Sequence, residues 1–445
     1  MRDLFFLIHW FLIPLIILFF SRIFFGGVRF LSFPIIYLLS FFVLIYLQAL
    51  NIYFNYINEL NFILSVWIVP LLYVFTCGLL LQLFKHDARK IQESMLFVHL
   101  SSRDILITRV VPVLSAFFIC LPFVFILDKG VSNIALFHIL AHPGDTSRAM
   151  ELRIGGLVSN YSSILTLIYS YSRALLYPLY ITYLTALTVK GIVSRLHFMV
   201  ALGVTLFFSV LTTAKAPLAY ICFGILVSYY FTRRGYLSKK KVSFLILFFL
   251  FLPALFYPLL FGVGGVDALE VTVSNLWRRL TWVPSYVCAV YFDAFTNLFH
   301  HVGFSSNRFL AWITGSEYIP TAAFIYDNYF SSTVPGGLVD ASYFASFYAD
   351  WGMIGTLLGT VLVAAITAWL QILFDCKGND LLGVSFRAVT VIAIVQLMQT
   401  NIYSSSLGRG FISAPILLIV ISIGWSVIAS NLGKYFRPFE ENSKL

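Results

Sequence analysis

The sequence has little charge. Asp, Glu, Lys and Arg make up 11% of its 445 residues, whereas a soluble domain carries about 25%. Apolar residues account for 60% of the chain. Runs of about 20 apolar residues, each long enough to cross a bilayer of roughly 30 Å, recur along its whole length. These proportions exclude an ordinary soluble protein and predict an all-α polytopic integral membrane protein.

The motifs of nucleotide and metal chemistry are also missing. There is no glycine-rich dinucleotide fingerprint and no P-loop. The five cysteines lie mostly within apolar runs, without the spacing of metal ligands. His138 and His142 are one helical turn apart, but no nearby Glu completes a site. We therefore expect no metal and no cofactor. No cleavable signal peptide is expected, because no small-residue cleavage site follows the long first apolar run.

The apolar runs predict about eleven transmembrane helices. The expected spans are 4–21, 30–50, 62–84, 110–127, 167–189, 197–213, 216–232, 242–262, 352–374, 385–400 and 411–431.

These spans divide the chain into three regions. Residues 1–262 are expected to form a membrane bundle with outer loops at 128–163 and 213–216. Residues 263–351 form a large outer loop containing short helices, and 352–445 form the last membrane helices and a tail. The net charge of +10 arises mainly from short connections on the side of the C-terminus. This pattern follows the positive-inside rule rather than indicating nucleic acid. It places the C-terminus in the cytoplasm, and the N-terminus and the large loop outside.

The large loop contains the first candidate ligands. A loop of this size is uncommon unless it is functional or disordered, and its aromatic content argues against disorder. Arg278 and Arg279 lie between Trp277 and Trp282. Guanidinium groups bind pyrophosphate bidentately and keep their charge near lipid. The alternative is an amphipathic interfacial helix whose arginines reach out to water.

Further basic residues lie at the expected outer surface. Lys215 occupies a tight turn between two apolar runs, where a cation is costly unless it reaches water or pairs with an anion. Arg409 lies between two glycines, and Arg173 lies inside an apolar run. Each is a candidate ligand for a lipid-linked phosphate, or else a polar interfacial residue. Arg148 and Arg153 are weaker candidates.

A general base is harder to identify. Asp340 and Asp350 flank an aromatic segment just before an expected span, where a carboxylate can take a proton from a sugar hydroxyl. His300 is a further candidate, and Asp293 and Glu317 are alternatives. For each acid, a solvated or structurally paired carboxylate is the competing interpretation. Tyr343 belongs to a dense set of aromatic residues suited to packing on sugar rings, or simply to interfacial packing.

Four segments give the sequence a family resemblance. TTAKAPLAYICFG, WRRLTWVPSYVCAV, PGGLVDASYFASFYADWGMIG and SSSLGRGF resemble, in layout across most of the chain, the bacterial oligosaccharide repeat-unit (O-antigen) polymerases, the Wzy class. Lys215 stands where that family more usually has Arg. The acidic residue often found near the end of the large loop is not obvious, since Ser346 occupies its approximate place. That departure leaves the base open.

The resemblance implies a glycosyltransferase of the bacterial inner membrane with a periplasmic active face. Its substrate would be an undecaprenyl-pyrophosphate-linked oligosaccharide, and the growing glycan would be transferred to a new lipid-linked repeat. A chain-length regulator in the same membrane is expected only from the resemblance. The rivals are an O-antigen ligase, a lipid-glycan flippase and, more distantly, a membrane acyltransferase. A flippase is expected to have related halves and short, even loops, which a single dominant loop does not match.

Overall fold

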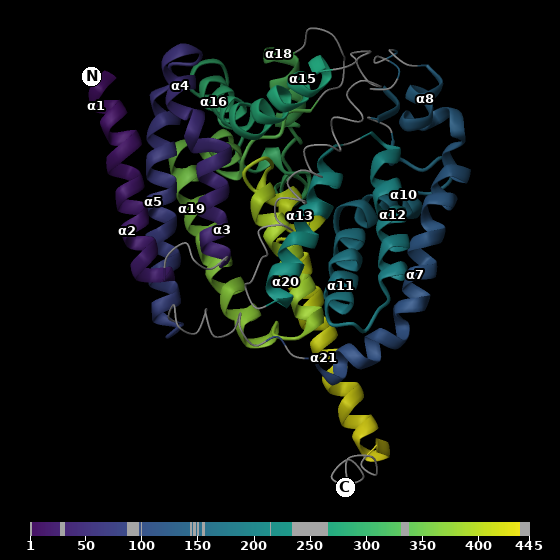
Figure 1. Cartoon of the computed structure of the whole chain (residues 1–445). Coiled ribbons are helices and arrows are strands. Elements are labelled where there is room, and N and C mark those ends of the chain that lie inside the picture. Colours follow the sequence, from purple (N-terminus) through teal and green to yellow (C-terminus); the bar gives the residue numbers. More distant parts are fainter. Residues whose placement is uncertain are drawn as a thin grey trace.

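The computed structural model describes residues 2–26, 32–86, 98, 100–142, 145, 148, 151–153, 156–213, 215–233, 266–330 and 338–436. Every regular element in these ranges is helical (Figure 1). In chain order they are α1 (Arg2–Leu7), η1 (Ile8–Leu12), α2 (Ile13–Phe25), α3 (Phe33–Phe41), η2 (Phe42–Tyr46), α4 (Leu47–Asn55), α5 (Leu60–Leu83), α7 (Ser102–Lys129), η3 (Val131–Asn133), α8 (Ala135–Ala141), α10 (Ser163–Tyr171), η4 (Ser172–Leu176), α11 (Tyr177–Val189), α12 (Arg195–Leu211), α13 (Lys215–Thr232), α15 (Val266–Trp277), η5 (Arg278–Trp282), α16 (Val283–Asp293), η6 (Ala294–Leu298), η7 (Gly303–Ser306), α17 (Arg308–Thr314), α18 (Thr321–Tyr329), α19 (Tyr343–Lys377), α20 (Leu381–Gln396), η8 (Ser404–Gly408) and α21 (Ser413–Phe436).

Several of these helices fit a bilayer by length and composition. Five of the described helices qualify in full: Arg2–Phe25, Phe33–Asn55, Leu60–Leu83, Arg103–Lys129 and Tyr343–Lys377. Four more are apolar but shorter: Arg195–Leu211, Pro217–Thr232, Leu381–Gln396 and Ser413–Trp425. The predicted all-helical architecture is therefore confirmed for the described residues, and it is consistent with a helical membrane protein. The count of eleven stays a prediction, and its span at 242–262 lies outside the described residues.

Two groups of helices make up the bundle. In the first, α5 packs along both α2 and α19, and in the second, α11, α13 and α20 pack on one another. Helix α3 contacts both α19 and α20 and so joins the two groups. Aromatic side chains fill the first group. The rings of Tyr37 and Tyr73, for example, stack with centroids 3.6 Å apart and are fully buried.

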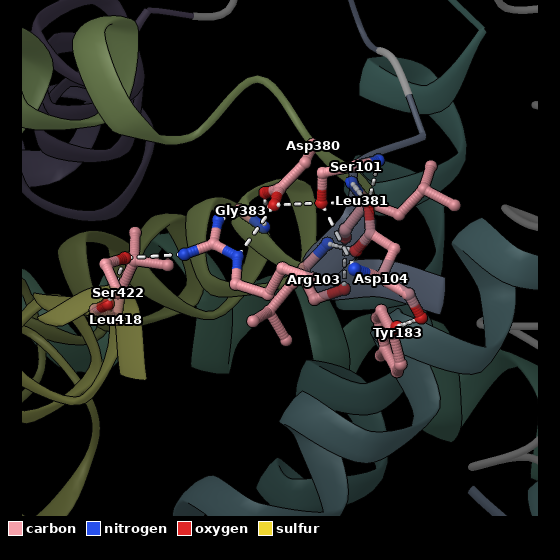
Figure 2. Close-up of polar contacts among 11 residues, drawn as sticks. Ser101, Arg103, Asp104, Tyr183, Asp380, Leu381, Gly383, Leu418 and Ser422 are labelled. Carbon is pink, nitrogen blue, oxygen red and sulfur yellow. Dashed lines mark hydrogen bonds and ion pairs between the residues drawn. The ribbon is translucent and has the colours of Figure 1, made fainter. Parts of the chain in front are cut away.

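A buried polar joint connects the beginnings of α7 and α20 (Figure 2). Asp104 accepts hydrogen bonds from the backbone of Ser101 in its own helix and from Leu382 of α20, both at 3.0 Å. Asp380 caps its own helix and also accepts from Arg103 Nε at 2.8 Å. Each helix start leaves unsatisfied N–H groups. Carboxylates at both helix starts accept hydrogen bonds from these donors, and their negative charge interacts favourably with the positive ends of the helix dipoles.

The segment at 263–351 is more helical and more deeply packed than a loop. Helix α16 packs against α4, α5 and α19, with its residues from Val287 to Phe292 buried. Helix α19 begins at Tyr343, before the predicted span start at 352, and contains a kink at Trp351 and Gly352. The predicted boundary therefore coincides with a kink inside one continuous helical element. The N-terminus, α15 and α18 lie at one end of the bundle, and the C-terminus lies at the other (Figure 1).

Candidate functional site

A cavity of about 740 Å³ lies where the start of α13, the α15–α16 helices, the end of α20 and the segment before α19 meet. One part of its wall is apolar and includes Pro178, Val283, Val287 and Phe330. The rest is polar. The polar lining residues are Arg153, Arg173, Tyr220, Asn275, Arg278, Arg279, Asp340, Gln396, Gln399, Thr400 and Arg409.

Irregular helical turns position most of the arginines. Arg173 lies in η4, a π-helical turn, and Arg278 and Arg279 lie in a second one, η5. A third, η8, directly precedes Arg409. A π-helical turn shifts the side chains after it around the helix, and such turns are frequent at functional sites. The backbone irregularity thus directs basic side chains from three distant segments into one cavity.

Local contacts hold these arginines in place. Arg173 Nη1 donates a 2.9 Å hydrogen bond to the hydroxyl of Thr212, in the turn between α12 and α13. The guanidinium of Arg278 lies 4.9 Å from the ring centroid of Trp282. Gly410 follows Arg409 with φ +99°, and a Cβ there would lie 2.9 Å from Val389. Only glycine fits this turn at low cost.

The cavity carries an excess of positive charge. It has five arginines and one aspartate in its wall. Within the described part of the chain, none of the five arginines forms an ion pair with a carboxylate. The pKa of Arg153 is lowered by the loss of surrounding water, although part of its side chain remains exposed, and further by the charge of Arg279. Because like charges repel one another, a cavity lined in this way favours an anionic ligand.

Asp340 is the acidic group of the cavity. Its neighbour Val339 donates to the carbonyl of Ala322 at 3.1 Å and accepts from the hydroxyl of Tyr291 at 2.9 Å. These bonds fix the backbone beside Asp340. Partial burial raises the pKa of the Asp340 carboxyl above its ordinary value, and the charge of Arg409 lowers it in part. A carboxyl with a raised pKa is better matched to proton transfer near neutral pH than an exposed Asp.

The structure brings together only some of the residues expected from the sequence. Arg173, Arg278, Arg279, Arg409 and Asp340 all line the cavity. So does Arg153, which the sequence placed among the weaker candidates. The tight turn at 213–216 is also adjacent, because Pro217 lines the cavity. Lys215 begins α13, but its side chain lies outside the described part of the structure.

Three other candidates do not line the cavity. Tyr343 is fully buried and hydrogen-bonded to Tyr37, so its surroundings are those of a packing residue rather than a sugar ligand. Asp350 is 2% exposed and lies in the first segment of α19, directly before the kink at Trp351 and Gly352. His300 is exposed, between η6 and η7. Tyr343 and Asp350 belong to the buried first segment of α19, and His300 lies in the connection between η6 and η7, so none of the three lines the cavity.

Neutral hydrogen-bonding residues were missed by the sequence analysis. The hydroxyl of Tyr220 donates to Gln399 Oε1 at 3.1 Å, and Gln396 and Asn275 line the same cavity. One signal pointed to them. Gln396 and Gln399 are polar residues one helical turn apart in an otherwise apolar run, and polar groups inside the membrane are functional candidates by default.

The arrangement combines an anion-binding wall, a carboxylate and an apolar wall. It suits a ligand that is part anion and part hydrocarbon, and the carboxylate can accept a proton from a neighbouring hydroxyl. Comparison of the chain with protein-family models, curated proteins and solved structures finds no match.

Proposed function

We propose that this chain is a glycosyltransferase that polymerises undecaprenyl-pyrophosphate-linked oligosaccharide repeats at the periplasmic face of the bacterial inner membrane. One observation carries the proposal: five arginines without a carboxylate partner within the described residues converge on one cavity beside Asp340. A pyrophosphate fits this charge pattern, because guanidinium groups bind its oxygens bidentately. The apolar wall suits the adjoining isoprenoid chain.

The reaction follows from these groups. A hydroxyl oxygen of the acceptor repeat attacks the anomeric carbon of the donor glycan, and the bond from that carbon to the pyrophosphate oxygen breaks. The pyrophosphate leaves on its lipid with the bonding electron pair, and the hydroxyl proton passes to Asp340. Arginines near the leaving group stabilise its developing charge, which preorganised donors do best in a site with little water. No nucleotide is required, because the leaving group is the lipid pyrophosphate.

The cavity by itself does not distinguish the acceptor. A ligase would use the same donor and the same arginines but would transfer the glycan to a different acceptor. A flippase would bind the same lipid without breaking a bond. The phenotype of a deletion separates these functions, since they act at successive steps of one pathway.

The test is to delete the gene and resolve the surface lipopolysaccharide on a gel. We expect the ladder to collapse to core plus a single repeat, because export and attachment still operate. Bare core alone would contradict polymerisation and indicate a flippase or ligase.

The deletion strain should then be complemented with the wild type, Arg279→Ala and Arg148→Ala at matched protein levels. Arg148 is the control, because it is exposed and pairs with Glu151 at 2.7 Å. We expect the wild type and Arg148→Ala to restore the ladder, and Arg279→Ala to fail.

A further inference from the structure

The cavity wall contains an unsatisfied buried acceptor. Gln396, the last residue of α20, is 4% exposed and lines the cavity. Its side-chain oxygen, Oε1, has no hydrogen-bond partner within the described structure. A buried polar atom left without a partner destabilises the folded protein. An unsatisfied buried atom is expected at a position where a bound ligand supplies the missing hydrogen-bond partner.

The side-chain amide of Gln396 indicates which kind of ligand group can form the missing hydrogen bond. A phosphate oxygen only accepts hydrogen bonds, so it does not satisfy an amide oxygen. A hydroxyl both donates and accepts, and it fits Gln396 whichever way the amide is oriented. The nearby Tyr220 and Gln399 are neutral, and their mutual bond joins a hydroxyl and an amide. This part of the wall is therefore suited to a neutral, hydroxyl-rich ligand rather than to the anion.

The same part of the wall is tied to the segment that carries Asp340. The carbonyl of Leu397, next to Gln396, accepts hydrogen bonds from Ser342 Oγ and from the backbone N–H of Tyr343, both at 3.1 Å. These two bonds join the end of α20 to the chain two residues beyond Asp340. A hydroxyl held by Gln396 is thus kept close to the carboxylate that would take its proton.

We infer that Gln396, with Gln399 and Tyr220, forms a sugar-binding part of the cavity wall. This part adjoins Arg409, whose charge acts on Tyr220. This inference rests on the proposed function and specifies which residues hold the neutral sugar. The hydroxyl belongs either to the sugar attached to the pyrophosphate or to a separate acceptor glycan. Gln396 is a binding and positioning residue in both cases.

The experiment uses the purified full-length protein with two probes. One is undecaprenyl pyrophosphate without sugar, and the other is the same lipid carrying one N-acetylhexosamine. The variant is Gln396→Met, because Met is unbranched, similar in length and unable to form the missing bond. The matched control is Gln82→Met, at an exposed position near the end of α5.

We expect Gln396→Met to weaken binding of the sugar-bearing lipid about five- to tenfold and to change binding of the bare lipid less than about twofold. We also expect its apo melting temperature to rise, because an unsatisfied buried oxygen is replaced by an apolar group. A merely structural glutamine would instead lose stability on substitution. Gln82→Met should leave the binding of both lipids and the melting temperature unchanged.

A second arm identifies the sugar. A free neutral oligosaccharide is added to protein already holding the bare lipid. If Gln396→Met weakens this binding, the site holds the acceptor; if only the lipid-linked sugar is affected, it holds the donor. Should Gln396→Met fail to fold, Gln399→Met repeats the two binding measurements alone, because Gln399 Oε1 already accepts a hydrogen bond from Tyr220 and no rise in melting temperature is expected there.

Two outcomes overturn the inference, and they are distinguishable. Equal loss of both lipids, or a lowered apo melting temperature, would show that Gln396 does not form a separate sugar site. Failure of the wild type to bind either lipid would overturn the proposed function as well.

Discussion

At the scale of single residues, the arginines of the cavity differ from ordinary interfacial arginines. Interfacial arginines pack their apolar stems on the protein or lipid and keep their charged ends in water. Those of the cavity come from separate segments and line one cavity, with Arg153, Arg278 and Arg279 exposed and the other two half-buried. Five guanidinium groups that line one cavity with a single carboxylate are suited to an anionic ligand.

Substitution of Arg409 tests this explanation. We expect Arg409→Ala to lower turnover roughly 100-fold, because a donor aimed at the developing charge is lost. Arg409→Lys should recover only part of the activity, since a lysine ammonium is a point charge and lacks the bidentate hydrogen bonding of a guanidinium group. Turnover is measured with lipid-linked repeats and purified protein, and equal activity of wild type and Arg409→Ala would contradict the assignment.

The pH dependence of turnover tests the role of Asp340. Because burial raises the pKa of its carboxyl, its basic form is lost at a higher pH than that of an exposed Asp. Turnover should therefore fall as the pH decreases through that raised pKa.

Arg409→Gln should move this acid limb to still higher pH, because the opposing charge of Arg409 is removed. Asp340→Asn should lower turnover about 100-fold or more and abolish the limb. If Asp340→Asn retains an unchanged pH profile, Asp340 is not the base.

At the scale of elements, the kink in α19 separates its short first segment from the membrane-spanning part. Gly352 adopts φ +64° and ψ −151°, a region essentially restricted to glycine. A Cβ at this position would also lie 3.0 Å from Nε2 of His301. The kink therefore depends on both the glycine backbone and the space it leaves.

Gly352→Ala should destabilise the protein by about 1–3 kcal/mol through backbone strain alone. Gly203→Ala is the matched control, since a Cβ there meets nothing within 4 Å, and it lies inside α12. We expect the control to be neutral or slightly stabilising, by up to about 1 kcal/mol. The measurement is thermal unfolding in detergent, and equal melting temperatures for both variants would contradict this account of the kink.

The polar contacts between the beginnings of α7 and α20 are the basis of a second prediction at this scale. Asp104→Ala would leave the backbone N–H groups of Leu381 and Leu382 without their acceptor. We expect a loss of about 2–5 kcal/mol of stability. Ser194→Ala removes a cap that serves one helix only and should cost about 1 kcal/mol. Comparable melting temperatures for these two variants would show that the joint contributes no more than an ordinary cap.

At the scale of the whole molecule, the proposed topology places the cavity and the N-terminus outside and the C-terminus inside. Helices α15 and α18 lie at the end opposite the C-terminus (Figure 1). Two exposed cysteines are available as probes, Cys120 and Cys376, and Cys376 is near the C-terminal end of α19.

Labelling of cysteines in whole cells tests this topology. In a Cys120→Ser background, a maleimide that does not cross the inner membrane should label Asp327→Cys in α18 and spare Cys376. Permeabilisation should then expose Cys376, which serves as the internal control. Labelling of Cys376 before permeabilisation would reverse the proposed orientation.

The sequence by itself determined the helical membrane architecture, because apolar runs of bilayer length have few alternatives in water or lipid. It also proposed the cavity-lining residues Arg173, Arg278, Arg279 and Arg409 as phosphate ligands and Asp340 as a base, from the chemistry of their side chains near expected spans. It did not reveal that these residues share one cavity, or that Tyr343, Asp350 and His300, chosen for their side-chain chemistry, lie outside its lining.

Only the tertiary structure decided which residues meet. The π-helical turns at 172–176 and 278–282 rotate side chains in a way that regular periodicity does not anticipate. The kink at Gly352 and the bonds from Ser342 and Tyr343 to Leu397 depend on contacts between segments far apart in sequence. The unsatisfied oxygen of Gln396 is visible only in the packed molecule, because hydrogen-bond satisfaction is a property of the surroundings rather than of the residue.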